Sequence, residues 1–337
     1  MAAVWAASLR HSEEEIVRRI LVLSAVLLMV LAAGPAAWAD NIAAAGDISQ
    51  KVGGTRNDQA TARLLAPSSG NGIGLVLALG DTQYECGEME NYLGAYNLSW
   101  GQFKGITRPV PGHHEYLTSS PQGCLGQAPG PMRMLQPAGA DYYQYFAGRT
   151  PPHPGYYSFN AEAWHFVVLN TTCTVVPGGC SGAMLDWLKA DLAANKLGCT
   201  VVMGHSPYLS SAAPSYGTPD LSAIWPTLVL NDVDLFVAGH SHAYERLARV
   251  RTQGNVDEDW GPGDGDDGHA GVPIVIAGTG GHSLIPFGRI HPASRSRVAG
   301  RYGILKIVPN YPSLGRWVQA FKTTDGRTLD RVEMRCH

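Results

Sequence analysis

Four apolar segments of the chain each end at a glycine that is followed by an aspartate or a histidine. The segments stop at Asp47, Asp81, His205 and His240. Residues 56–66, between the first two segments, have helical spacing instead. Strands that alternate with helices predict an α/β fold, in which ligands bind beyond the carboxyl ends of the strands. The pattern therefore favours folds that bring these four polar residues to one edge.

The same periodicities predict further elements along the chain. Past the first 39 residues no linker divides the sequence, and its last third predicts strands only, which indicates a single α/β domain of mixed sheets over residues 40–337. The predicted strands are 41–49, 72–81, 163–170, 199–205, 233–242, 272–280, 302–309 and 316–323, and the predicted helices are 56–66, 183–194 and 221–231.

Residues 1–39 predict a secretory signal peptide. Arg18 and Arg19 precede the unbroken apolar run ILVLSAVLLMVLAA, and Ala-Trp-Ala at 37–39 fits a small-residue cleavage site before Asp40. The run is short for a membrane span, and an uncleaved anchor is the alternative. We therefore expect a secreted or extracytoplasmic protein without a stable membrane span after cleavage.

The charge balance limits the kind of partner. The 337 residues include 25 Lys and Arg against 28 Asp and Glu, a formal net charge of -3. No basic face is therefore expected for nucleic acid or for an anionic membrane. The partner is expected to be a small molecule or an exposed group on a larger one.

The six cysteines predict disulfides. Cys86, Cys124, Cys173, Cys180, Cys199 and Cys336 are even in number and lack paired C-x-x-C spacing. In an oxidising compartment such cysteines favour disulfides over a zinc site, although their pairing cannot be deduced from sequence. The one local pair we predict is Cys173 with Cys180, across a Pro-Gly-Gly turn.

The segment GHHE at 112–115 adds two histidines and a glutamate to the strand-end residues. A lone aspartate after a strand is commonly a turn or a helix cap, and a lone histidine is commonly a structural hydrogen bonder. Separate turns do not explain why a glycine precedes a metal-ligand residue type in each case. Glycine lets the backbone turn sharply and approach a bound group closely, so a shared metal site is favoured. The glycines precede Asp47, Asp81, His113, His205 and His240.

Five ordered motifs carry a family resemblance. They are GD at 46–47, GDTQY at 80–84, GHHE at 112–115, VVMGH at 201–205 and GHSH at 239–242. Together they resemble the motifs of the calcineurin-like metallophosphoesterases, and Tyr84 resembles the tyrosine of the purple acid phosphatase branch. The resemblance spans nearly the whole mature chain. It implies two mixed β-sheets packed face to face and flanked by helices in four layers, with the site on the strand-end loops.

The resemblance also implies a centre of two metal ions. Asp81 would bridge the ions through its two oxygens. Asp47, Tyr84 and His242 would complete the first site, and His205 and His240 would serve the second. Because His240 and His242 are alternate residues, directing both inward requires a turn, which we expect at Gly239.

The chain departs from the family pattern at two positions. Many members have D-x-H at the first motif, whereas here Ser49 follows Asp47 and Ile48. Tyr84 can compensate, and hard oxygen donors favour Fe(III) in the first site with a divalent ion, Zn, Fe or Mn, in the second.

The second departure is His113, which stands where the family has an asparagine ligand. Imidazole is a stronger ligand than a carboxamide, so His113 would give the second site three histidines and a preference for zinc. Loss of this ligand, with reduced activity, is the alternative.

The remaining site residues have roles near the substrate. His114 keeps the family's proton-donor position and would assist the leaving group, while Glu115, which is not itself a metal ligand, is expected to orient His114. The segment GTGGH at 278–282 predicts a turn beside the site that brings His282 to the substrate.

The sequence thus predicts a secreted, acid phosphatase-like hydrolase of phosphate esters. A hydroxide activated by the metal pair would attack phosphorus in line. The substrate would be a small phosphate ester or a phosphorylated group. The alternative is a non-catalytic exported protein that keeps the fold and binds a metal or another ligand.

Overall fold

The computed structural model describes residues 41–50, 56–118, 133–134, 139–213, 217–255, 271–309 and 315–336. The predicted signal peptide lies outside these ranges and stays a prediction. Among the described residues, no helix combines the length and the apolar character that a membrane crossing needs.

Six strands form the first sheet, in the order β15-β14-β13-β1-β2-β3. β1, β2 and β3 run parallel, whereas β13 to β15 are antiparallel neighbours on the other side of β1. The bounds are β1 (Asn41–Ala45), β2 (Ile73–Ala78), β3 (Thr107–Pro109), β13 (Gly303–Pro309), β14 (Arg316–Thr323) and β15 (Thr328–Arg335).

Seven strands form the second sheet, in the order β12-β10-β11-β9-β8-β7-β6. Its centre, from β7 through β8 and β9 to β11, is parallel, and antiparallel strands complete both sides. The bounds are β6 (Tyr157–Ala161), β7 (Trp164–Val168), β8 (Cys199–Gly204), β9 (Leu235–Ala238), β10 (Tyr244–Val250), β11 (Val272–Ala277) and β12 (Ser294–Val298).

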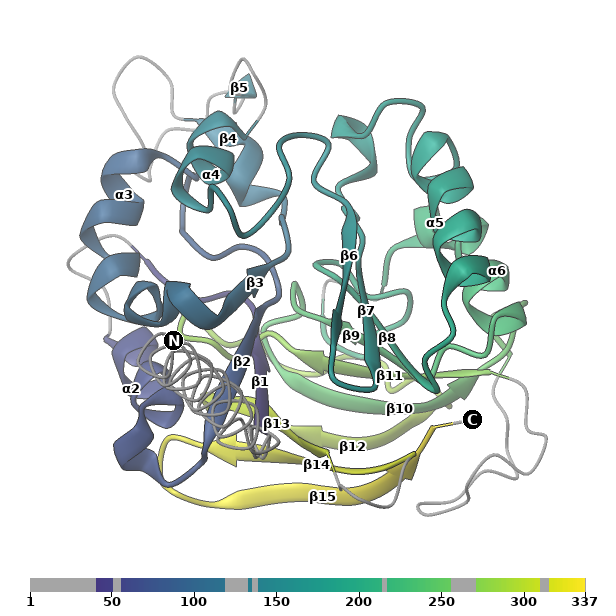
Figure 1. Ribbon diagram of the computed structural model, residues 1–337. Coiled ribbons are helices and arrows are strands. Elements are labelled where there is room, and N and C mark those ends of the chain that lie inside the picture. Colours follow the sequence, from purple (N-terminus) through teal and green to yellow (C-terminus); the bar gives the residue numbers. More distant parts are fainter. Residues whose placement is uncertain are drawn as a thin grey trace, which may run out of the picture. The chain divides into compact units, whose positions relative to one another are not determined.

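The two sheets enclose one apolar layer and are each covered by helices on the outside (Figure 1). In β9, Leu235 and Val237 point into the layer between the sheets, while Phe236 and Ala238 pack under helices. Because both faces of the central strands are buried, these strands are continuously apolar rather than alternating. This explains why their sequences were recognisable as unbroken apolar runs.

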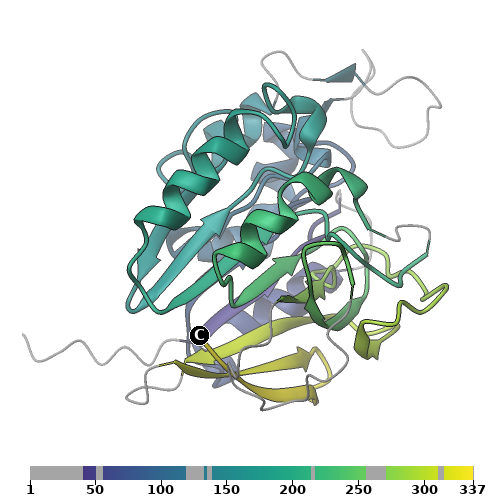
Figure 2. The same ribbon diagram turned by 90° about the vertical axis from the view of Figure 1, so that its right-hand side faces the viewer.

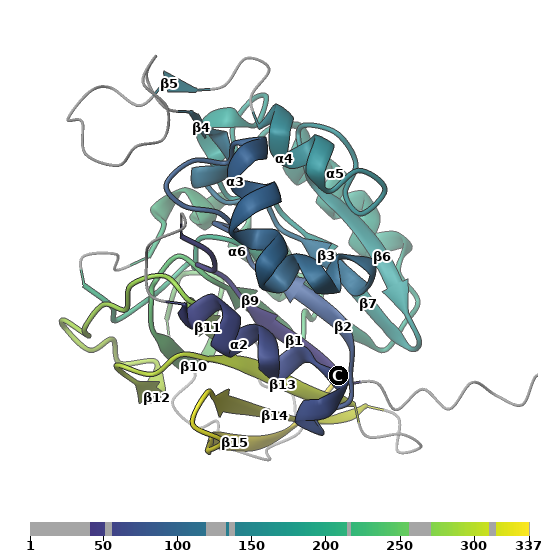
Figure 3. The ribbon, with the colours of Figure 1, turned by 90° about the vertical axis from the view of Figure 1, so that its left-hand side faces the viewer.

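Helices α2, α3 and α4 pack on the first sheet, as Figure 3 shows for α2 beside β1. α5 and α6 lie along the outer face of the second sheet, in teal and green in Figure 2. The bounds are α2 (Asn57–Leu65), α3 (Met89–Gly94), α4 (Ala140–Tyr145), α5 (Ala183–Ala194) and α6 (Trp225–Leu230). Short 3-10 turns and a two-stranded ribbon complete the described elements: η1 (Pro67–Ser69), η2 (Tyr96–Leu98), η3 (Trp100–Ile106), η4 (His114–Tyr116), η5 (Cys173–Val175), η6 (Pro219–Ala223), β4 (Leu117–Thr118) and β5 (Arg133–Met134).

This architecture confirms the predicted fold of two mixed sheets flanked by helices. The prediction of a single helix over 221–231 was wrong in one respect. The segment forms the 3-10 turn η6 and then α6, with Pro226 in the first turn of α6. Proline lacks a backbone N–H and is tolerated in the first turn but not in the middle of a helix. It therefore marks the start of α6.

Two disulfides join Cys173 to Cys180 and Cys199 to Cys336, the first as predicted. None of the described cysteines is free. Cys199 begins β8 in the second sheet, and Cys336 follows β15 in the first sheet. The second disulfide therefore ties the two sheets together.

Removing the Cys199–Cys336 disulfide is expected to destabilise the protein more than removing the Cys173–Cys180 disulfide. The bonded residues are 137 positions apart in the first case and 7 in the second. Loop-closure entropy then predicts losses of about 5 and about 2.5 kcal/mol in the free energy of unfolding. Urea unfolding of the two double Cys→Ser variants measures both losses, and an equal or reversed order would contradict the prediction.

Candidate metal centre

Parallel strands from both sheets deliver polar residues to one place. Asp47 follows β1 and Asp81 follows β2 in the first sheet, while His205 follows β8 and His240 follows β9 in the second. The backbones behind them are bonded together, since the N–H of Asp47 donates to Gly80 O at 3.1 Å. The convergence predicted from the strand ends is thus present in the fold.

Glycines let these strand ends pack closely. A Cβ atom on Gly46 or on Gly239 would lie 2.8 Å from the carbonyl oxygen of Leu79. The sharp turns are made by the polar residues themselves, with φ of 59° at Asp47 and 65° at His240. The turn expected at Gly239 is therefore made by His240, and the glycine is needed for the close approach of the backbones.

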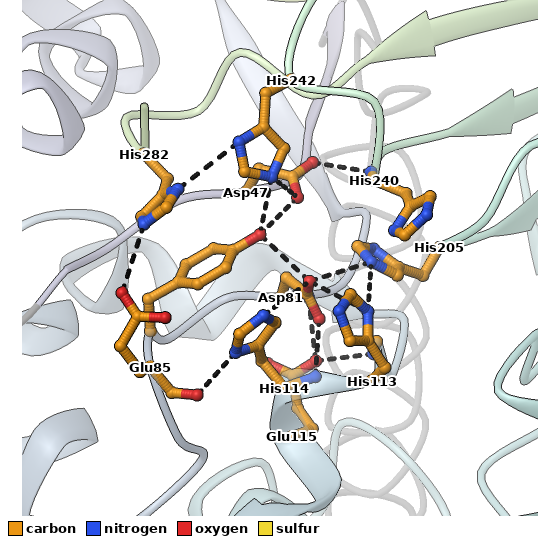
Figure 4. A network of polar contacts seen from close by, with 12 residues as sticks. Asp47, Asp81, Glu85, His113, His114, Glu115, His205, His240, His242 and His282 are labelled. Atoms are coloured by element: carbon orange, nitrogen blue, oxygen red, sulfur yellow. Dashed lines mark hydrogen bonds and ion pairs between the residues drawn. The ribbon is translucent and has the colours of Figure 1, made fainter. Parts of the chain in front are cut away.

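A first group of donor atoms gathers around the hydroxyl of Tyr84. It includes Asp47 and His242, which lie next to each other in Figure 4. This oxygen lies 2.6 Å from Asp47 Oδ1, 3.0 Å from Asp81 Oδ2 and 3.0 Å from His242 Nε2. Asp47 Oδ1 and His242 Nε2 are 3.1 Å apart. These are the four residues predicted for the first metal site.

A second group contains three histidines and the same aspartate. One ligand atom from each of Asp81, His113, His205 and His240 lies within 4.8 Å of every other one. His113 Nδ1 is 3.2 Å from both His205 Nε2 and Asp81 Oδ2. His113 therefore occupies the position that the sequence predicted for a ligand in place of asparagine.

One oxygen of Asp81 faces both groups. Its Oδ2 lies 3.0 Å from the Tyr84 hydroxyl and 3.0 Å from His205 Nε2, whereas its Oδ1 accepts the backbone N–H of His114 at 2.9 Å. From the sequence, one oxygen of Asp81 is expected for each ion. The structure instead assigns one oxygen to the shared position and the other to the loop that carries His114.

The two carboxylates are held ionised. Burial raises the pKa of Asp81, but the positive charges that His113 and His205 carry when protonated outweigh this effect and bring it well below its usual value. Burial likewise raises the pKa of Asp47, and the charge of His242 brings it down to about 2. Two fully buried negative charges therefore face the same small volume.

The histidines of the second group suit a cation. Burial lowers the pKa of His113 and His240 to about 4, so both rings are neutral and offer lone pairs at neutral pH. The buried Nδ1 of His240 has no hydrogen-bond partner among the described residues. A buried nitrogen without a partner is costly unless an ion or a water meets it.

His205 carries a proton at the position where a metal ion would bind. Its Nδ1 donates to Leu79 O at 2.9 Å, which leaves Nε2 facing Asp81. Burial lowers the pKa of His205, but the charge of Asp81 raises it to about 10. A metal ion would take the place of the Nε2 proton, since metal binding to histidine releases protons.

Tyr84 needs a cation in order to ionise. Burial, followed by the charges of Asp47 and Asp81, raises the pKa of its hydroxyl well above the usual value. The ring lies between two imidazoles, stacked on His282 with centroids 3.7 Å apart and tilted against His114 at 4.3 Å. His282 thus reaches the site as predicted from the GTGGH segment, and it contacts Tyr84 directly.

His114 is fixed beside Asp81. Its ring Nδ1 donates to the carbonyl of Glu85 at 2.5 Å, and its Nε2 lies 4.0 Å from Asp81 Oδ2. The role of Glu85 was not predictable from the sequence, because every residue carries a backbone carbonyl. Only its position next to Tyr84 placed it near the site.

Glu115 joins two loops of the site. Its buried carboxylate accepts the backbone N–H groups of Asp81, Thr82 and Gly112 at 2.8, 2.7 and 2.6 Å. Glu115 is expected from the sequence to orient His114, and none of these contacts reaches the His114 ring directly. Glu115 acts on His114 through the backbone, by holding the 112–115 loop against the 80–84 loop.

Ser49, the residue in place of the family's first-motif histidine, bonds residues that lie outside both donor groups. Its hydroxyl donates to Asp58 Oδ2 at 2.8 Å and lies 3.0 Å from the hydroxyl of Ser99. The position therefore supports helix α2 rather than the metal centre.

The comparisons with known proteins agree with this geometry. A family model described as calcineurin-like phosphoesterase matches residues 41–244. Purple acid phosphatase 15 of Arabidopsis thaliana is 36% identical over 100 residues, which are 28% of this chain and 18% of the relative. The "Probable inactive purple acid phosphatase 9" of the same plant is 26% identical over 195 residues, which are 53% of this chain and 28% of the relative.

Among solved structures, a purple acid phosphatase from yellow lupin seeds, PPD1, has the same fold with a TM-score of 0.66. It is 16% identical, and the match covers 88% of this chain and 53% of the lupin chain. This chain therefore spans about half of the lupin protein and less than a third of the two plant relatives.

The family implies a dinuclear metal centre, and the two donor groups that meet at Asp81 fit one. Because the family model covers more than half of its length, the chain belongs to the calcineurin-like phosphoesterase family.

Proposed function

We propose that the protein is a secreted phosphoesterase that hydrolyses phosphate esters at a centre of two metal ions. The observation that carries the proposal is the shared oxygen of Asp81, with a phenol, a carboxylate and an imidazole on one side and three imidazoles on the other. A structural ion pair does not need this many electron-pair donors around one carboxylate oxygen. Two cations that share the oxygen do need them.

The types of ligand atom indicate which metal ion each donor group would hold. Asp47, Tyr84 and His242, with Asp81, would hold Fe(III), because carboxylate and phenolate oxygens are hard ligands. His113, His205 and His240, with Asp81, would hold the divalent ion, Zn, Fe or Mn. Three imidazoles and one carboxylate oxygen are ligands that zinc readily accepts.

When bound, the two ions would supply a water nucleophile that is activated near neutral pH and would neutralise the phosphoryl charge. The chain itself then has to deliver a proton to the departing alkoxide. His114 is suited to this, because Glu85 O fixes its Nδ1 and leaves Nε2 on the side of Asp81. Glu115 holds this loop in place by accepting the backbone N–H groups of Asp81 and Gly112.

Secretion is supported by the predicted signal peptide and by the disulfides, which form and persist in oxidising compartments. Export would also place the enzyme among extracellular phosphate esters.

Metal analysis combined with hydrolysis of para-nitrophenyl phosphate tests the proposal. We expect two metals per chain, turnover, and a visible absorption band from the tyrosinate–iron contact. The Tyr84→Phe variant should lose this band, because only the phenol oxygen can donate charge to the iron at that position. A single metal without turnover would contradict the proposal and would support a non-catalytic binding protein.

A further inference from the structure

Two segments that leave the metal centre run side by side. One follows His205, and the other follows His282. They are joined where Gly288 N–H donates to Ser211 O at 2.8 Å and Ala213 N–H donates to Pro286 O at 3.1 Å. Residues 206–213 and 283–292 therefore form a continuous paired segment, called the rim below, that starts at two residues of the site.

The buried carboxylate of Glu245 fixes this rim from behind. It accepts the backbone N–H of Ser211 at 2.8 Å and the hydroxyl of Ser211 at 2.6 Å. The hydroxyl of Ser294 donates to the same carboxylate. With these donors its negative charge is satisfied, and the rim is held by strand β10.

A cavity of about 580 Å³ lies in this rim, lined by Ser210, Arg289, Ile290, His291 and Pro292. Its size falls within the range of small-molecule sites, about 300–1,000 Å³. Neither the family motifs nor the metal centre uses any of these side chains.

The polar groups of the cavity can all act as donors. Arg289 carries a permanent charge, and an arginine has no acceptor. His291 Nδ1 accepts the N–H of Ala293 at 3.1 Å, so the proton of the neutral ring is on Nε2. Ser210 Oγ accepts the N–H of Ala212 at 3.1 Å, which leaves its own proton to be donated. A lining of donors around one guanidinium suits an anionic oxygen group.

A short stretch of backbone connects the metal centre to the cavity. Ile285 N–H donates to the carbonyl of His242 at 3.0 Å. Arg289 follows four residues later, and four residues span at most about 14 Å. A substrate that touches both places therefore needs a length that matches this separation, and substrate length is the variable that the experiment below changes.

We propose that this cavity binds a second anionic group on the alcohol side of the phosphate ester that is cleaved at the metal centre. The preferred substrates would then be esters with two anionic groups, such as bisphosphates, with Ile290 and Pro292 beside the connecting carbons. This inference rests on the proposed function, because it assigns the substrate class of the same site.

The test compares alkyl monophosphates with α,ω-alkane bisphosphates of increasing chain length, using the metal-loaded full chain and measuring phosphate release. We expect a bisphosphate of one length to have a kcat/KM well above the statistical factor for two equivalent ends. Arg289→Gln should lower the bisphosphate-to-monophosphate ratio of kcat/KM by about tenfold, the usual scale for one charged hydrogen bond. Arg289→Lys should restore part of the ratio, because it restores the charge.

Arg316→Gln is the matched control. It removes the same charge from an exposed arginine of β14 that pairs with Glu333, so the ratio should stay at the wild-type value. A wild-type ratio at the statistical factor would overturn the inference, as would an equal loss in the Arg289 and Arg316 variants.

Two further outcomes are distinguishable. If the cavity took free phosphate instead, Arg289→Gln would change non-competitive inhibition by added phosphate and leave the ratio unchanged, which overturns the substrate assignment. If no ester is cleaved, the proposed function fails. Calorimetry then decides the inference, which requires an alkane bisphosphonate to bind at least about tenfold more tightly than the monophosphonate and Arg289→Gln to remove the difference.

Discussion

Replacing Asp81 with asparagine is expected to weaken the binding of both metal ions by more than about a hundredfold, since even the outer partners of metal ligands contribute 10–100-fold. The reason is that one oxygen, Oδ2, lies 3.0 Å from a donor atom of each group. Asparagine keeps the size of the side chain but removes the charge that two adjacent cations require. Phosphate-ester turnover should fall with the metal content.

Metal content and turnover of the purified variant check this result together. Asp191→Asn is a matched control, because Asp191 is a carboxylate that bonds His165 at 2.8 Å and Ser158 at 2.6 Å, and neither residue belongs to the metal centre. The control should retain both ions. Loss of only one ion from Asp81→Asn would show that the two donor groups do not share this oxygen.

Much of the fold was predictable because the central strands are buried on both faces. β2 and β9 are apolar throughout, β1 and β8 contain one polar residue each, and the polar residues that follow these strands mark their ends. β10 was not predicted, although all of its residues are buried. Its sequence contains Glu245 and Arg246, whose partners are distant in the sequence: Ser211 and Ser294 for Glu245, and Asp330 for Arg246. Such partners cannot be deduced from local spacing.

The residues of the two donor groups were predictable for a related reason, because each follows a strand end in a recognisable motif. The groups that aim the imidazoles were not. The Nδ1 atoms of His114, His205 and His242 bond the backbone carbonyls of Glu85, Leu79 and Ser283. Every residue has a backbone carbonyl oxygen, so residue identity does not reveal these contacts. Only the folded backbone shows which carbonyl lies next to each ring. They decide which nitrogen of each ring remains for chemistry.

Replacing His114 with alanine is expected to lower turnover by about a hundredfold to ten-thousandfold, the usual contribution of a general acid. Both metals should be retained. The link between this loop and Asp81 is the backbone N–H of His114, which donates to Oδ1 and is kept in alanine. Metal analysis and steady-state kinetics of one preparation separate the two effects.

A comparison of two leaving groups tests whether His114 delivers a proton. Para-nitrophenolate departs readily without a proton, whereas an alkoxide does not, so the loss in His114→Ala should be much larger for an alkyl phosphate. His282→Ala is the matched control, because His282 also packs on Tyr84, at 3.7 Å, but the proposed mechanism gives it no proton to deliver. Any loss in that variant should be the same for both esters. An equal loss for both esters in His114→Ala would instead mean that the ring only supports Tyr84 and holds the site in shape.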